Sequence, residues 1–195
     1  MSMSEGDLGE RFERQLVRHC SPTLAGLKSG NIFNLFIDLG QRRSLDQSIS
    51  AWNARLNGKG IYLTVLKSDG ARALVYVYRR GMLAEDLGSE AAARFLSPYG
   101  YRSSDPDASI ERLKERIDSA SPFPHEIGLF LGYPLHDVVG FIENGGQAPI
   151  LSGCWKVYSN ADQARERFEM FRKCSGEYLN VFNSGTSADQ LAVGP

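Results

Sequence analysis

The segment of residues 123–142 holds the densest group of side chains that could do chemistry. It reads FPHEIGLFLGYPLHDVVGFI, so two histidines, two acids and a tyrosine interleave with glycines and apolar residues. Histidine exchanges protons near neutral pH and often binds metals. Because polar groups in an apolar frame cost free energy unless a partner satisfies them, the segment predicts a site built into the core. It does not fit the zinc-protease motif His-Glu-x-x-His, since position 129 is leucine.

Cys20 is a candidate nucleophile, because a histidine base could help it to form thiolate. On a helix the neighbouring His19 points about 100° away from it. His125 is therefore the better partner, with Glu126 next to it in the sequence. Cys20, His125 and Glu126 are the candidate catalytic residues. Two alternatives oppose this assignment: a helix ending near Cys20 raises the pKa of its thiol, and Glu126 can simply complement a helix N-terminus.

The cysteines indicate a reducing compartment. There are three, Cys20, Cys154 and Cys174, without a Cys-x-x-Cys pair. An odd count argues against a disulfide framework, and the missing pair argues against a zinc ribbon. The alternative role for each is that of a small buried hydrophobic residue. With no secretory signal at the N-terminus and no apolar run of about 20 residues, we expect a cytoplasmic protein.

Composition and charge narrow the class of partner. The 195 residues are 42% hydrophobic and 23% charged, which is typical of a globular protein. The net charge of -1 provides no overall attraction to nucleic acid or anionic lipid. A basic group at residues 165–173 is diluted by acids and is typical of a solvated helix face. We therefore expect a small molecule or a protein as partner, and neither nucleic acid nor a membrane.

The pattern of the chain predicts an α+β fold in a single domain of residues 1–195. Asp-Gly between two β-rich runs indicates a hairpin, and Pro124 and Pro134 each begin a short helix. The ordered core is expected at about 7–182, with disordered termini. The predicted mixed sheet has about four strands, at 31–37, 61–67, 71–79 and 152–158, with helices packed on it. Helices are expected at about 7–20, 44–56, 81–87, 89–96, 105–117, 124–132, 134–143, 160–174 and 178–182. A three-layer α/β arrangement is the alternative.

Four blocks of the sequence resemble a bacterial family that is defined as a domain of unknown function and is met largely in anaerobes. The blocks are CSPTLAGLK at 20–28, ALVYVYR at 73–79, PHEIGLFLGYP at 124–134 and WKVY at 155–158. They lie in the same order as in the family, and the resemblance covers roughly residues 12–181. It implies a single cytoplasmic domain, and it transfers no activity, catalytic residue, cofactor or partner.

The leading hypothesis for function is a small-ligand-binding or redox-associated protein with a site that contains cysteine and histidine. The turn at 20–28, the segment 125–137 and the strand around Cys154 frame this site. The candidate ligand-binding residues are Thr23, Lys28, Tyr133, Cys154, Lys156 and Tyr158. The second hypothesis is a protein-interaction module without chemistry, in which Gly128, Gly132 and Gly140 allow close packing. The third is a metal site of cysteine and histidine. No motif names a cofactor.

Overall fold

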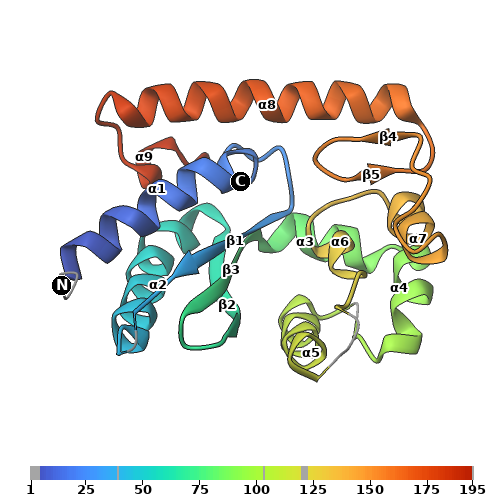
Figure 1. The fold of residues 1–195 in the computed structure, drawn as a ribbon, viewed down its shortest axis with the longest axis horizontal. Coiled ribbons are helices and arrows are strands. Elements are labelled where there is room, and N and C mark those ends of the chain that lie inside the picture. The colour runs from blue at the N-terminus through green and yellow to red at the C-terminus, as the bar shows by residue number, and fades with distance from the viewer. Residues whose placement is uncertain (1–4, 39, 103, 120–122, 195) are drawn as a thin grey trace. The chain divides into compact units, whose positions relative to one another are not determined.

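The computed structural model describes residues 5–38, 40–102, 104–119 and 123–194 (Figure 1). They fall into two compact units. Unit 1 is Met1–Arg80 with Cys174–Pro195, and unit 2 is Gly81–Lys173. The prediction of one domain for residues 1–195 stays a prediction. Among the described residues, no helix has both the length and the apolar composition to cross a bilayer.

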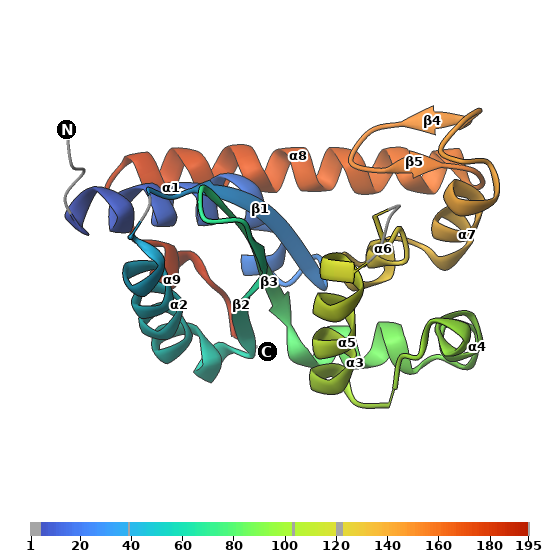
Figure 2. The same ribbon diagram turned by 60° about the horizontal axis from the view of Figure 1, so that its bottom comes forward.

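Unit 1 is built on a three-stranded antiparallel sheet in the order β1-β3-β2. Helix α1 packs against β1, and α2 packs against β2 (Figure 2). The strands are β1 (Gly30–Phe36), β2 (Ile61–Ser68) and β3 (Arg72–Arg79). The helices are α1 (Glu5–Leu24), α2 (Arg42–Leu56), the short 3-10 helix η1 (Asn57–Lys59), the end of α8 (Ala161–Asn183) and α9 (Ala188–Leu191).

The core of unit 1 follows from the two periodicities of its elements. Phe33 and Leu35 alternate along β1, and Leu45, Trp52 and Leu56 recur at helical spacing on α2. All of them are buried in one apolar cluster. The predicted hairpin between β2 and β3 is confirmed. Its turn is held by the Asp69 carboxylate, which accepts the N–H groups of residues 71 and 72.

The predicted α+β class is confirmed, but the fourth predicted strand is not part of the sheet. Residues 151–157 form a separate hairpin in unit 2, of β4 (Leu151–Ser152) and β5 (Lys156–Val157). The N–H of Gly153 donates to the carbonyl of Trp155 at 3.0 Å, so the chain reverses inside the predicted strand. Every pairing among the described strands is antiparallel, which contradicts both a mixed sheet and the three-layer α/β alternative.

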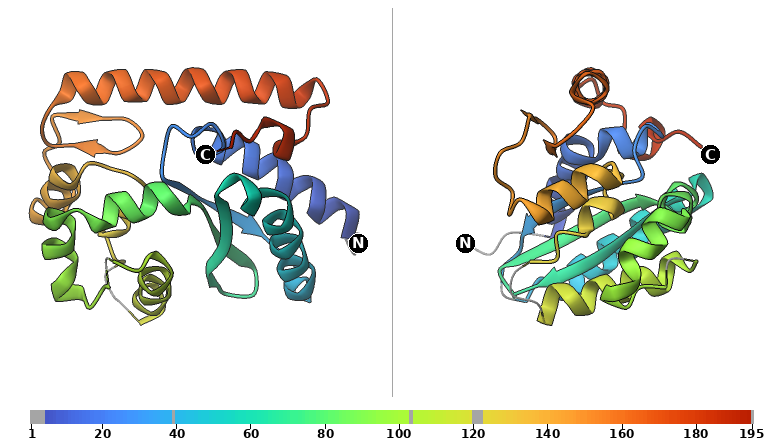
Figure 3. Two further views of the ribbon diagram at one scale, coloured as in Figure 1. Left: turned by 180° about the vertical axis from the view of Figure 1, so that it is seen from behind. Right: turned by 90° about the vertical axis from the view of Figure 1, so that its right-hand side faces the viewer.

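Unit 2 is mainly helical, and the two short helices that begin near Pro124 and Pro134 are confirmed. Gly132 joins them with φ +67, in the left-handed region that favours glycine. Figure 3 shows the β4–β5 hairpin beside α7. The helices are α3 (Arg80–Gly88), α4 (Glu90–Leu96), the 3-10 helix η2 (Ser97–Tyr99), α5 (Pro106–Ser119), α6 (Ile127–Phe130), α7 (Leu135–Glu143) and the first part of α8.

Two predictions of helix extent and one prediction of disorder differ from the structure. Helix α1 continues through Pro22 to Leu24, although proline was expected to end it near Cys20. The two helices expected at 160–174 and 178–182 are one helix, α8, since nothing in the intervening Ser-Gly-Glu is a proline. The C-terminal tail was expected to be disordered, but it forms α9. At the other end, the expected disorder falls partly on residues 1–4, which lie outside the described residues.

The tail is ordered by two cations of unit 1. Arg79 is buried and donates from Nη2 to the carbonyls of Leu24 and Val193, at 2.7 and 2.9 Å, and from Nε to that of Thr23 at 2.6 Å. Lys59 donates to two further carbonyls, those of residues 189 and 192, each at 2.6 Å. The contacts to the tail join segments more than a hundred residues apart, so no local pattern predicts them.

Candidate functional site

The four blocks that carry the family resemblance form one cluster in each unit. In unit 1, Arg79 of the second block binds the carbonyls of Thr23 and Leu24 in the first block. In unit 2, Tyr133 of the third block stacks on Trp155 of the fourth, with ring centroids 5.1 Å apart. The first cluster is a packed structural contact, and the second forms the wall of a cleft.

Cys20 lies in the core of unit 1 and not at a surface. Its side chain is fully buried, and burial raises the pKa of its thiol, while the nearby charge of Lys28 opposes the rise. Thr23, also buried, donates from its hydroxyl to Asn31 Oδ1 at 2.7 Å. Cys20 and His125 belong to different units, so their pairing stays a prediction. The buried thiol matches the alternative of a small hydrophobic residue.

The three thiols are predicted to differ sharply in reactivity. Cys154 is exposed, whereas Cys20 and Cys174 are buried. For both buried thiols, burial is the main cause of a raised pKa. Because thiolate is the reactive form, we expect one thiol per chain to react quickly with 5,5′-dithiobis(2-nitrobenzoate) at about pH 8. A Cys154→Ser variant should lose this fast phase, and denaturant should expose the remaining two thiols. Fast modification of Cys20 in the folded protein would contradict this assignment.

Unit 2 contains a cleft of about 360 Å³ between the α6–α7 segment and the β4–β5 hairpin. Most of the residues around it are apolar or aromatic, and its polar groups are few. It is lined by His125, Ile127, Gly128, Leu131, Tyr133, Asp137, Val138, Phe141, Ser152, Gly153, Trp155 and Lys156. Of the predicted site residues, the structure therefore brings together His125, Tyr133 and Lys156. Thr23, Lys28 and Cys20 belong to unit 1.

Aromatic rings form two sides of the cleft. On one side the His125 and Phe141 rings are in contact, with centroids 4.8 Å apart. On the other, Trp155 stacks on Tyr133 and makes an edge-to-face contact with Phe168, with ring centroids 4.5 Å apart. The Tyr133 hydroxyl donates to the carbonyl of Cys154 at 3.2 Å. Burial, together with the neighbouring Cys154, raises the pKa of Tyr133 to about 12, so Tyr133 is a neutral hydrogen-bond donor at physiological pH.

Asp137 positions the β4–β5 hairpin, which forms one wall of the cleft. Its carboxylate is buried and accepts the indole N–H of Trp155 at 2.7 Å. Its other oxygen accepts the backbone N–H groups of Tyr158 and Ser159, at 2.8 and 3.3 Å. These three donors provide hydrogen-bond partners for both oxygens of the buried carboxylate. The bond to the indole N–H fixes the orientation of Trp155, and the other two hold the backbone that follows β5.

Glu126 also has a structural position. Its carboxylate is buried and accepts hydrogen bonds from the Tyr101 hydroxyl, at 3.0 Å, and from Nε of Arg116, with which it forms an ion pair. Burial raises the pKa of Tyr101, and the charge of Glu126 adds to this rise. The carboxylate proposed for catalysis thus attaches α5 to the start of α6, and Glu126 is not one of the residues that line the cleft.

Two glycines allow the elements around the cleft to approach closely. A Cβ at Gly128 would lie 2.8 Å from Val138 Cγ2, and one at Gly140 would lie 2.6 Å from Cβ and Cγ of Tyr158. The predicted ligand-binding residue Tyr158 thus packs on α7, and its buried hydroxyl has no hydrogen-bond partner among the described residues. The hypothesis of a protein-interaction module predicts this close packing at Gly128 and Gly140.

Lys156 is the cleft's fixed positive charge. Its ammonium donates to the carbonyl of Gly146 at 2.6 Å and lies 5.8 Å from the centroid of the Phe141 ring. This double contact keeps the charge over the aromatic wall. Within the described part of the chain, no group of three or more histidine, cysteine, aspartate and glutamate side chains is arranged to hold a metal ion.

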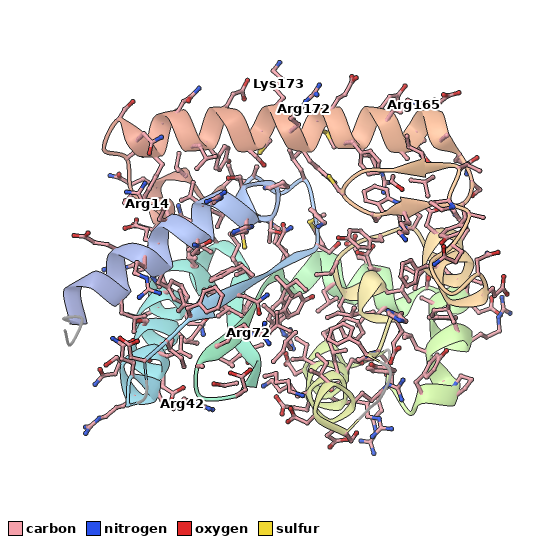
Figure 4. The ribbon with its side chains drawn as sticks, in the orientation of Figure 1. Arg14, Arg42, Arg72, Arg165, Arg172 and Lys173 are labelled. Atoms are coloured by element: carbon pink, nitrogen blue, oxygen red, sulfur yellow. The ribbon has the colours of Figure 1, made fainter. Side chains whose placement is uncertain are left out.

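The basic residues of α8 are surface charges. Figure 4 shows Arg165, Arg172 and Lys173 projecting from the solvent side of that helix. Arg165 pairs with Asp162 at 2.6 Å, and both side chains are largely exposed. Such pairs contribute little to stability. The arrangement matches the expected solvated face.

Sequence reasoning did not identify four residues that build the cleft. Phe141, Ser152 and Trp155 form its walls, and Asp137 supports Trp155. Trp155 and Asp137 had a usable signal, since the first lies in the WKVY block and the second in the segment of interleaved polar residues. Ser152 had none, because its position depends on the hairpin.

One comparison with known proteins identifies a relationship. A family model described as "Protein of unknown function (DUF3793)" matches residues 16–192. It spans all four blocks and both units. No curated protein and no solved structure matches the chain.

Proposed function

The chain belongs to the DUF3793 family of unknown function, and we propose, from the cleft in unit 2, that it binds a small organic molecule carrying an apolar ring. The observation that carries this proposal is an aromatic cleft of about 360 Å³ assembled from two of the blocks typical of the family. Small-molecule sites commonly have volumes of about 300–1,000 Å³, with apolar walls and few polar groups. A ligand of one or two fused rings suits this volume and these walls.

The contacts that hold Trp155 in the wall of the cleft also favour ligand binding. Trp155 is held by Asp137 at 2.7 Å and by the rings of Tyr133 and Phe168. A side chain fixed before the ligand arrives loses little further entropy on binding. This preorganisation distinguishes Trp155 from a mobile tryptophan on the surface, which would lose more entropy when a ligand binds.

A titration with 2-naphthalenemethanol tests the proposal, because this neutral probe offers two fused rings and no charge. Isothermal titration calorimetry should give one site per chain with a dissociation constant of about 1 mM or tighter. Ser152 is exposed and lines the cleft, so a Ser152→Phe variant should fill it with little effect on folding. We expect this variant to lose at least about tenfold in affinity, which corresponds to about 1.4 kcal/mol.

The matched control is Ala91→Phe, which adds the same side chain at an exposed position of α4 in the same unit. It should bind as the wild type does. If the wild type does not bind the probe, or if both variants bind equally well, the cleft is not the site of binding.

A protein-interaction module is the second candidate, and the close packing at Gly128 and Gly140 favours it. A redox-associated role is supported by the exposed thiol of Cys154, whose neighbours Gly153 and Trp155 both line the cleft. Reduced cysteines also favour the expected cytoplasmic location. The metal-binding alternative gains no ligand cluster among the described residues.

A further inference from the structure

We infer that the ligand of this cleft carries a single anionic group, such as a carboxylate on its ring, and that Lys156 is the residue that selects it. The inference rests on the proposed function, since it concerns the same cleft. It is based on the charged and polar groups that line the cleft, and on which of them already have hydrogen-bond partners within the protein.

The lining residues of the cleft include one negative side chain, and both of its oxygens already accept hydrogen bonds within the protein. Asp137 is only 2% exposed, and its two oxygens accept three hydrogen bonds from Trp155, Tyr158 and Ser159. Tyr133 keeps its proton, with a pKa of about 12, and donates to the Cys154 carbonyl. Asp137 therefore directs its oxygens at donors within the protein, and Tyr133 adds no negative charge to the cleft.

Lys156, in contrast, retains donors. An ammonium group has three N–H donors, and the described structure uses one of them on the Gly146 carbonyl. The exposed side chain keeps the remaining donors over the aromatic wall. A carboxylate can therefore bind Lys156 without breaking the bond to Gly146, and such charge-assisted hydrogen bonds are the stronger kind.

His125 provides a second donor next to the same ring. Its ring centroid lies 4.8 Å from that of Phe141, while Nζ of Lys156 lies 5.8 Å from that centroid. Both side chains therefore lie next to the Phe141 ring, where each can donate to a ligand that contacts this ring. Because Lys156 is the only permanent cation among the lining residues of this cleft, a single negative charge matches it better than a polyphosphate does.

The test compares two probes that share a ring system, 2-naphthoate and the neutral 2-naphthalenemethanol. The wild type should bind 2-naphthoate about tenfold more tightly, which is typical of one partly exposed charge pair in a cleft. Lys156→Met should reduce this preference to less than about twofold, chiefly through a weaker affinity for 2-naphthoate. His125→Phe, which keeps a ring but removes its N–H groups, should reduce the preference about threefold.

The control is Lys173→Met, which removes one positive charge from an exposed position of α8 in the same unit. It should keep the full preference. Equal binding of both probes by the wild type overturns the inference but not the proposed function, whereas binding of neither overturns the proposed function. An equal loss of preference in Lys156→Met and Lys173→Met would assign the effect to net charge and would also overturn the inference.

Discussion

Replacing Asp137 with alanine is expected to lower the free energy of unfolding by about 3 kcal/mol and to abolish binding of both naphthalene probes. The carboxylate is buried under the hairpin and accepts the Trp155 indole N–H and two backbone N–H groups. Without it, one buried and two partly buried donors lose their acceptor and Trp155 loses its fixed orientation. The effect exceeds that of an ordinary surface substitution because both the vacated volume and the unpaired donors lie inside the unit.

Urea unfolding followed by Trp155 fluorescence measures this change. The chain has two tryptophans, so a Trp52→Phe background leaves Trp155 as the only reporter. Asp137→Asn should fall between the wild type and alanine, since its amide keeps one acceptor oxygen. Asp162→Ala is the matched control, because this exposed carboxylate pairs with the exposed Arg165, and it should cost less than about 1 kcal/mol. Wild-type stability of Asp137→Ala would refute the supporting role of Asp137.

Replacing Arg79 with leucine is expected to destabilise unit 1 by about 3–4 kcal/mol. The guanidinium is buried, and its bonds to the carbonyls of Thr23, Leu24 and Val193 join the end of α1 to the C-terminal tail. Burial lowers the pKa of Arg79, and the phenol of Tyr178 opposes this shift. Leucine fills a similar volume but leaves these buried carbonyls without donors.

Trp52, buried on α2, reports the unfolding of unit 1 when Trp155 is replaced by phenylalanine. Arg79→Lys should recover less than half of the loss, because a single ammonium cannot match the planar fork of the guanidinium. Arg72→Leu is the control on the same strand, and its exposed pair with Asp69 at 3.5 Å predicts a change below about 1 kcal/mol. Limited proteolysis should also cut the tail faster in Arg79→Leu than in the control. Equal stability of the Arg79→Leu and Arg72→Leu variants would contradict the role of Arg79 in ordering the tail.

Elements with local causes were predictable from the sequence. The Asp69-Gly70 turn fixes the β2–β3 hairpin, and the prolines at 124 and 134 separate α6 from α7. Elements that depend on distant partners were not. The tail is ordered by contacts of Arg79 and Lys59 across more than a hundred residues, and the reversal at Gly153 turned an expected strand into a hairpin.

The predictions of site residues also divide into those that depend on residue type and those that depend on tertiary contacts. His125, Tyr133 and Lys156 were recognised because their residue types alone suggest binding, and they do line one cleft. The same reasoning proposed Glu126 and Cys20, whose partners and burial depend on the fold: Glu126 binds Arg116, and Cys20 lies in the core of unit 1. Residue type thus identifies candidates, while tertiary contacts decide which of them remain available to a ligand.

The most direct test of ligand binding in the cleft of unit 2 is a nuclear magnetic resonance titration that follows the two tryptophan indole N–H signals. Trp155 lines the cleft, whereas Trp52 is buried in the core of unit 1. On addition of 2-naphthoate, the Trp155 signal should move and reach saturation, while the Trp52 signal stays in place. In Ser152→Phe the Trp155 signal should no longer respond. A Trp155 signal that stays unchanged in the wild type at saturating probe would contradict the assignment of this cleft as a ligand site.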